Sequence, residues 1–159
     1  MKIELKRFTT NARLSQETTA FAADVWVDGK HVGHARNDGR GGATLVHLDP
    51  SVRAQVEAFG AALVPAEYKT FTGGVEWLVD QLVDAELQKK SDKVFAKRLA
   101  KIDAKQRAAN SARGLGTARY RDGGEWSWFG FKNGADPADA AKLIAAKHNG
   151  KVDVVVVVP

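Results

Sequence analysis

The stretch GVEWLVDQLVDAELQKKSDKVFAKRLAKIDAKQRAA, residues 74–109, decides the fold of this chain. Apolar side chains recur at helical spacing in its first half, and a second apolar stripe in a shifted phase runs from Val94 to Ile102. The pattern fades before Gly114 and Gly116, which stop a helix. The stretch therefore predicts either one long helix that rotates its buried face or two helices that break near Ser91, a residue type suited to capping a helix.

Strands are predicted on the N-terminal side of this stretch, because apolar and polar residues alternate there. The predicted strands are residues 2–9, with a slip in the alternation before Phe8, and residues 19–27, 30–36 and 43–48.

Asp28-Gly29 predicts a two-residue hairpin turn between the second and third of these strands, since glycine adopts positive φ and aspartate tolerates it. In that register Val25 lies opposite Val32 on the core face. Trp26 then lies opposite His31 on the other face.

A helix is predicted after the fourth strand. Asp49-Pro50 is typical of a helix start, because aspartate caps backbone N–H groups and proline suits the first helical position. Pro65 ends this helix. Its buried stripe is predicted to be Val52, Val56, Phe59 and Leu63.

The C-terminal residues predict two strands, a helix and a further strand. Strands 117–121 and 125–132 flank Asp122-Gly123-Gly124, and Asp136-Pro137 begins a helix that ends near His148. Residues 154–158 are consecutive valines, and such a run predicts a strand that is buried on both faces. We therefore place the valine strand at the centre of a sheet, beside the tryptophan-bearing strand 125–132.

These elements predict an α+β fold with antiparallel β-hairpins, helices packed on one face, one long central helix and a C-terminal ββαβ unit. The chain has 159 residues, which suits a single domain, residues 1–159. The alternative is two lobes, residues 1–72 and 110–159, joined by the long helical segment 74–109.

Positive charge is concentrated in residues 89–121. This stretch holds eleven Lys or Arg and two Asp, whereas the whole chain has 24 Lys or Arg and 19 Asp or Glu. The remaining residues are therefore net negative. Such an asymmetry favours a surface that binds phosphate.

Within the predicted helix, lysines at every fourth position form a row that drifts slowly around the helix and can follow a phosphate backbone. Arginines add forked donors that suit phosphate oxygens. The predicted phosphate contacts are Lys93, Lys97, Arg98, Lys101, Lys105, Arg107, Arg113, Arg119 and Arg121. The alternative is a solvated helix face that binds nothing.

Two further stretches are candidate binding elements. Trp126 and Trp128 share one face of a predicted strand and are candidates for stacking on bases, with ordinary core packing as the alternative. The glycine-rich loop is a candidate anion cradle, with a plain glycine turn as the alternative. Its candidate residues are Asn37, Gly39, Arg40, Gly41 and Gly42.

The same loop carries a resemblance to known proteins. The run formed by residues 15–19, Phe21, residues 28–30 and residues 37–42 resembles the opening of small uncharacterised proteins encoded by bacteriophages. The resemblance covers the first third of the chain and implies no chemistry. It adds host takeover and defence evasion to the possible functions.

We expect no metal site, no cofactor and no assembled catalytic set. The chain has no cysteine, which excludes thiolate ligands and disulfides. His31 and His34 are three residues apart on a predicted strand, so they are expected on opposite faces. No nucleophile, base and orienting group come together in the sequence, so an enzyme is the least supported class.

The sequence also predicts where the protein acts. Its N-terminus has no long apolar segment, and its longest apolar run is too short to cross a bilayer, so we expect a cytoplasmic protein without a membrane partner. If it is encoded by a phage, the compartment is the host cytoplasm.

The favoured function is non-enzymatic binding of a phosphate-rich ligand, above all nucleic acid, through the basic helix. One alternative is a phage-encoded interaction module or inhibitor that docks an acidic host or defence protein. Another is a protein that sequesters a small nucleotide with Arg40 and the glycine loop.

Overall fold

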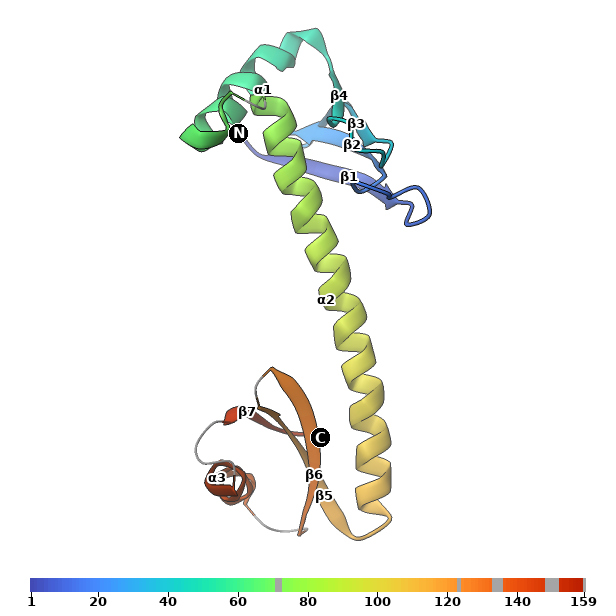
Figure 1. Ribbon diagram of the computed structural model, residues 1–159, viewed down its shortest axis with the longest axis vertical. Helices are drawn as coiled ribbons and strands as arrows, with labels where there is room; N and C mark the ends of the chain where they lie inside the picture. The colour runs from blue at the N-terminus through green and yellow to red at the C-terminus, as the bar shows by residue number, and fades with distance from the viewer. Residues whose placement is uncertain (71–72, 123, 133–135, 148–151, 159) are drawn as a thin grey trace. The chain divides into compact units, whose positions relative to one another are not determined.

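The computed structural model describes residues 1–70, 73–122, 124–132, 136–147 and 152–158. They form two compact units, Met1–Ser91 and Asp92–Pro159, and helix α2 (Gly74–Ser111) contributes to both. The chain has the predicted α+β class, with two antiparallel sheets and a long helix (Figure 1). Helix α2 is continuous, so the alternative of a break near Ser91 is wrong.

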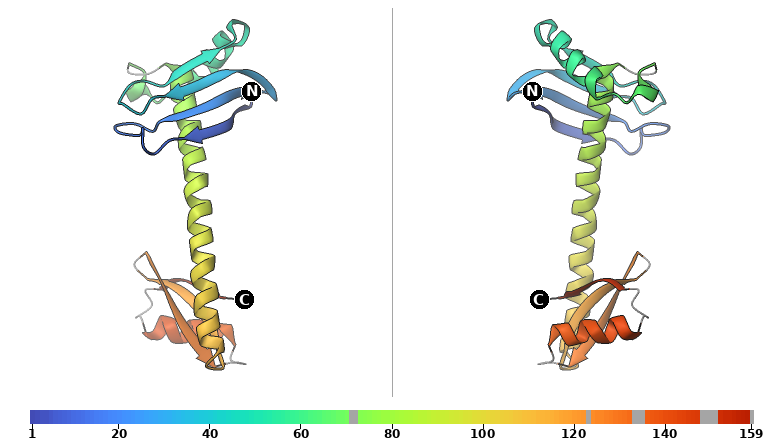
Figure 2. Two further views of the ribbon diagram at one scale, coloured as in Figure 1. Left: turned by 90° about the vertical axis from the view of Figure 1, so that its right-hand side faces the viewer. Right: turned by 90° about the vertical axis from the view of Figure 1, so that its left-hand side faces the viewer.

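The first unit is a four-stranded antiparallel sheet with helices on one face, as predicted. Strands β1 (Ile3–Thr10), β2 (Phe21–Val27), β3 (Lys30–Asn37) and β4 (Leu45–Leu48) are neighbours in chain order. Helix α1 (Pro50–Leu63) and the first half of α2 cover the same face of this sheet (Figure 2). A short 3-10 helix, η1 (Ala66–Tyr68), lies between the two helices in the chain.

The core of this unit lies between that sheet face and the helices. Val25 of β2, Val56 of α1, and Val75 and Val79 of α2 are all 1% exposed or less. Burying one such valine side chain contributes about 1.5 kcal/mol or more. The predicted stripe of α1 is correct for Val56, but Leu63 is 52% exposed, because the capping residue Val64 takes the buried position at this helix end.

The start of α2 is held by α1. The Glu57 carboxylate accepts hydrogen bonds from the backbone N–H groups of Gly74 and Val75, at 2.7 and 3.1 Å. These donors have no partner inside the helix, and a negative charge is favourable at a helix N-terminus. The sequence contained no spacing signal for this cap, because Glu57 belongs to another helix and lies 17 and 18 residues before the groups that it caps.

Two bulges determine which side chains lie on each face of the first sheet. In β1 the pairing shifts between Lys6 and Thr9, which confirms the slip predicted before Phe8. Arg7 has φ +50° within this bulge. Phe8 consequently packs with the core, and its ring lies 5.9 Å from that of Phe21.

The second bulge corrects the predicted hairpin register. The turn at Asp28 and Gly29 forms as expected, with φ of +47° and +81°, and Trp26 pairs with His31. Val25, however, pairs with Gly33 and not with Val32, because Val32 is an extra residue in β3. Gly33 permits this bulge, since a Cβ there would lie 1.9 Å from the backbone oxygen of His47.

The second unit contains the predicted ββαβ order. It comprises strands β5 (Leu115–Asp122), β6 (Glu125–Lys132) and β7 (Val152–Val157) and helix α3 (Pro137–Lys147). The strand order is β6-β5-β7, so the valine strand is at an edge and pairs with β5, not with the tryptophan strand β6. The predicted central position of the valine strand is wrong, because a run of β-branched residues indicates a buried strand but does not specify which strands it pairs with.

Helices flank both faces of this second sheet. Figure 1 shows α3 on one side of it and the last turns of α2 on the other. Ala118 in the central strand is fully buried, and Ile144 of α3 is 6% exposed. The end predicted near His148 lies outside the described residues, which include α3 up to Lys147.

Candidate nucleic-acid interface

The lysine row of α2 consists of Lys93, Lys97, Lys101 and Lys105, which follow one another by one helical turn each. All four side chains are exposed, as is the neighbouring Arg98. Within the described part of the chain, none of these five cations has a carboxylate within ion-pair distance. Their charge is therefore available to an external anion.

The C-terminal half of the lysine row, Lys101 and Lys105, faces away from the second sheet. Asp103 and Asn110, seven residues apart and hence on one face of α2, hold the helix to the sheet. The Asn110 amide donates to the Thr117 hydroxyl at 3.0 Å. Lys101 and Lys105 are each two positions from Asp103, which places them on the opposite side of the helix. The fold thus separates the anchoring face of α2 from its cationic face.

Arg119 does not belong to the cationic face. It donates to the Asp103 carboxylate, and its side chain is only 18% exposed. Its guanidinium carbon lies 4.9 Å from the centre of the Trp126 ring. Trp128 donates from Nε1 to the other Asp103 oxygen at 2.7 Å. Arg119 is therefore partly neutralised inside the unit.

The predicted stacking residues Trp126 and Trp128 lie in this same cluster. Both are half-buried on the sheet face that contacts α2, where Arg119 pairs with Trp128 and Arg121 pairs with Trp126 across the strands. Arg121 is likewise half-buried. Arg107 and Arg113 are exposed, in the last turns of α2 and in the turn that follows it. The arginines after Gly114 are thus placed apart from the lysine row.

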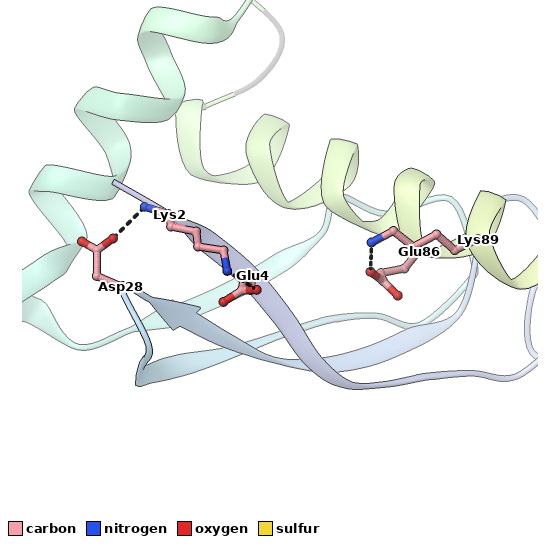
Figure 3. Close-up of polar contacts among 5 residues, drawn as sticks. All are labelled: Lys2, Glu4, Asp28, Glu86 and Lys89. Carbon is pink, nitrogen blue, oxygen red and sulfur yellow. Dashed lines mark hydrogen bonds and ion pairs between the residues drawn. The ribbon is translucent and has the colours of Figure 1, made fainter.

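Lys89 and Lys90, at the start of the basic stretch, belong to the first unit. Lys89 Nζ lies 2.7 Å from a Glu86 oxygen (Figure 3). Lys90 Nζ lies 3.3 Å from the Phe8 backbone oxygen and 4.3 Å from the centre of the Phe8 ring. Both cations have partners, so the freely available charge begins at Lys93.

Two apolar residues of the same helical segment are exposed. Val94 is 66% exposed and Phe95 is 52% exposed. They are the first residues of the second apolar stripe that the sequence predicted, and Leu99 and Ile102 of that stripe are half-buried. The stripe therefore packs only toward its C-terminal end.

The glycine-rich loop uses its polar groups internally. Asn37 is 8% exposed; its side-chain oxygen accepts from the Thr18 hydroxyl and from Gly39 N–H, each at 2.8 Å, and its amide donates to the Gly42 carbonyl. Gly39 and Gly41 have φ near +82°, which a side chain rarely adopts. Arg40 is exposed beside this turn. The Gly39 N–H is thus already paired within the loop that the sequence offers as an anion cradle.

The histidines are arranged differently from the prediction. Because of the bulge at Val32, His31 and His34 lie on the same face of the first sheet, and the expectation of opposite faces is wrong. His47 pairs with His34, and their rings stack with centroids 4.9 Å apart. No group of three or more His, Asp or Glu suited to a metal ion occurs among the described residues.

An acidic hollow lies on the first unit beside the glycine loop. It has a volume of about 470 Å³, and Glu17, Asp80 and Asp84 are among its lining residues. Burial raises the pKa of Asp80 above its ordinary value; a hydrogen bond from Thr44 Oγ1, 2.6 Å long, opposes this rise, and Asp84 and Glu76 add to it. Such a hollow repels phosphate, so it does not extend the cationic surface.

Comparison of the chain with protein-family models, with curated proteins and with solved structures finds no match. The resemblance to phage-encoded proteins stays a prediction. Among the residues that the structure describes, no helix is both long enough and apolar enough to cross a membrane.

Proposed function

We propose that this protein binds nucleic acid through the lysine row of α2, without catalysing a reaction. The observation that supports the proposal is the row itself: Lys93, Lys97, Lys101 and Lys105 are exposed and unpaired within the described residues, and Lys101 and Lys105 lie on the side of the helix away from the sheet. A cationic row at one-turn spacing suits the regular charge of a phosphate backbone.

Binding of this kind is driven by the release of counterions from the nucleic acid. Each phosphate contact contributes about 0.9 to the slope of log affinity against log salt concentration on duplex DNA. Four lysine contacts therefore contribute about 3.6 to that slope. The contacts go to the backbone, so the row by itself carries no base specificity.

The test measures the affinity of the full chain for a labelled DNA duplex by fluorescence anisotropy at several salt concentrations. In one variant Lys93, Lys97, Lys101 and Lys105 are changed to Gln. A matched control changes four exposed lysines elsewhere, Lys30, Lys69, Lys132 and Lys147, to Gln. We expect the first variant to lose most of its affinity and about 3–4 units of slope, and the control to keep its slope.

Two results would refute the proposal. One is the absence of detectable duplex binding by the unmodified chain at low salt. The other is an equal loss in both quadruple variants, since this would mean that net charge matters and the lysine row does not.

The exposed pair Val94 and Phe95 favours a second candidate, an interaction with an acidic protein. An apolar contact bordered by lysines fits a partner surface that carries an apolar pocket among carboxylates. A stoichiometric protein captured from nuclease-treated bacterial lysate by the unmodified chain, and not by a Phe95→Ser variant, would support this candidate. Retention of that protein by Phe95→Ser would count against it.

A further inference from the structure

The outer face of the first sheet is the side away from α1 and α2. It carries aromatic and imidazole rings and cations that are not part of the lysine row. Cross-strand pairing places Trp26 opposite His31 and His34 opposite His47 on this face. The three histidines are exposed and Trp26 is half-buried. Within the first unit, the helices cover only the other face (Figure 2).

The rings form two adjacent pairs. His34 and His47 are stacked, with centroids 4.9 Å apart and an interplanar angle of 29°. Trp26 and His31 meet edge to face, with centroids 5.8 Å apart. Lys6 Nζ lies 3.8 Å from the centre of the Trp26 ring. The face therefore offers flat surfaces together with a cation that is held by a ring and not by a carboxylate.

The charge on this face is suited to phosphate. Arg7 pairs with Asp24, the central carboxylate of the face, and Glu4 pairs with Lys2. Arg36 is exposed. A hollow of about 290 Å³ is lined by Arg7, Asp24, His34 and Arg36, among others. The acidic side chains are thus neutralised by neighbours, and the hollow has two guanidinium groups at its walls.

We propose that the outer face of the first sheet binds single-stranded nucleic acid. Bases stack on the His34–His47 pair and on Trp26 with His31, while Arg36 and Lys6 contact the phosphates that connect them. An open antiparallel sheet with exposed rings and interspersed cations suits unpaired bases, since these can present their faces to side chains. A duplex keeps its bases stacked inside, so it gains nothing from the rings.

This site is separate from the lysine row and does not rest on it. The lysine row contacts the backbone of either form of nucleic acid, whereas the outer face distinguishes single strands from duplexes. The two proposals therefore fail independently.

The test compares a labelled single-stranded oligothymidine with a duplex of the same total charge, both measured on the full chain by fluorescence anisotropy. The first variant changes His34 and His47 to Ala, and both are exposed, so it is expected to keep its thermal midpoint. The second changes Arg36 to Gln, and a Lys69→Gln control removes one charge from the exposed residue that follows η1.

We expect the double histidine variant to lose about fivefold or more of its single-strand affinity for each base that no longer stacks, and to keep its duplex affinity. Arg36→Gln weakens single-strand binding, and Lys69→Gln leaves it unchanged. Unaltered single-strand affinity in a folded double histidine variant overturns the proposal. So does an equal loss for duplex and single strand, or equally effective competition by polyglutamate of matched charge, because each shows a surface that recognises charge alone.

Discussion

Trp128 donates a hydrogen bond from Nε1 to Asp103 Oδ1 at 2.7 Å, and Arg119, its cross-strand partner, donates to Oδ2 of the same carboxylate. One aspartate of α2 thereby holds two neighbouring strands of the second sheet. The side chains of Asp103 and Arg119 are 15% and 18% exposed, so the pair is largely shielded from water. This contact removes both a carboxylate and an arginine from the charge presented to solvent.

Asp103→Asn is expected to destabilise the second unit by about 3 kcal/mol, because it leaves the Arg119 charge without a counterion in a largely buried position. The asparagine oxygen can still accept from Trp128, so the change isolates the ionic contribution. Urea unfolding monitored by tryptophan fluorescence measures the effect. Asp139→Asn, at an exposed site in α3, is the control and should leave the midpoint unchanged. Equal stability of the two variants would contradict the prediction.

Gly33→Ala is expected to destabilise the first unit by about 1–3 kcal/mol, since a Cβ at this position overlaps the His47 backbone oxygen and the strands must separate. The free energy of unfolding from urea titration measures the loss. Gly42→Ala provides the matched change, because a Cβ at Gly42 meets no atom within 4 Å. A Gly33→Ala protein as stable as Gly42→Ala would show that the bulge does not depend on glycine.

Asp80→Asn is expected to stabilise the first unit at neutral pH. Burial raises the pKa of Asp80, so its ionised form is less favourable in the folded state than in the unfolded state. The resulting cost is present above the folded-state pKa, and it diminishes as pH falls through that pKa toward the ordinary value of 3.8. The increase in stability caused by Asp80→Asn should therefore be present at neutral pH and should disappear at low pH. Urea midpoints at neutral pH and below pH 3.8 measure it. A gain that is equal at both pH values, or one shown also by the exposed control Asp38→Asn, would contradict this assignment.

The local signals in the sequence identified most elements of the fold. Asp28-Gly29 and Asp49-Pro50 indicated the hairpin and the helix start, because turn and cap geometries depend on a few adjacent residues. The slip before Phe8 indicated the β1 bulge, since the core position of Phe8 requires one extra residue in the strand. The register of β3 was missed, because the bulge at Val32 depends on how closely Gly33 approaches His47, a residue of another strand.

For the candidate sites too, the sequence predicted the features set by nearby residues and missed those set by distant ones. The spacing of Lys93, Lys97, Lys101 and Lys105 is enough to place them on one side of a helix, because residues four apart are neighbours on a helical surface. Nothing in the spacing of Arg119 indicated that Asp103, sixteen residues earlier, would neutralise it. The ring cluster on the first sheet was also not predicted, because an alternation without a bulge places His31 and His34 on opposite faces.

By itself, the sequence determined the α+β class, the helical character of residues 74–109 and the spacing of the lysine row, because helical and strand periodicity and turn chemistry act between residues close in the chain. It left open whether those residues form one helix or two, and the structure shows one. Only the tertiary structure decided which charges are paired, which strand is central and which side chains share a sheet face. Those outcomes depend on pairing between distant segments, where one added residue in a strand moves side chains from one face to the other.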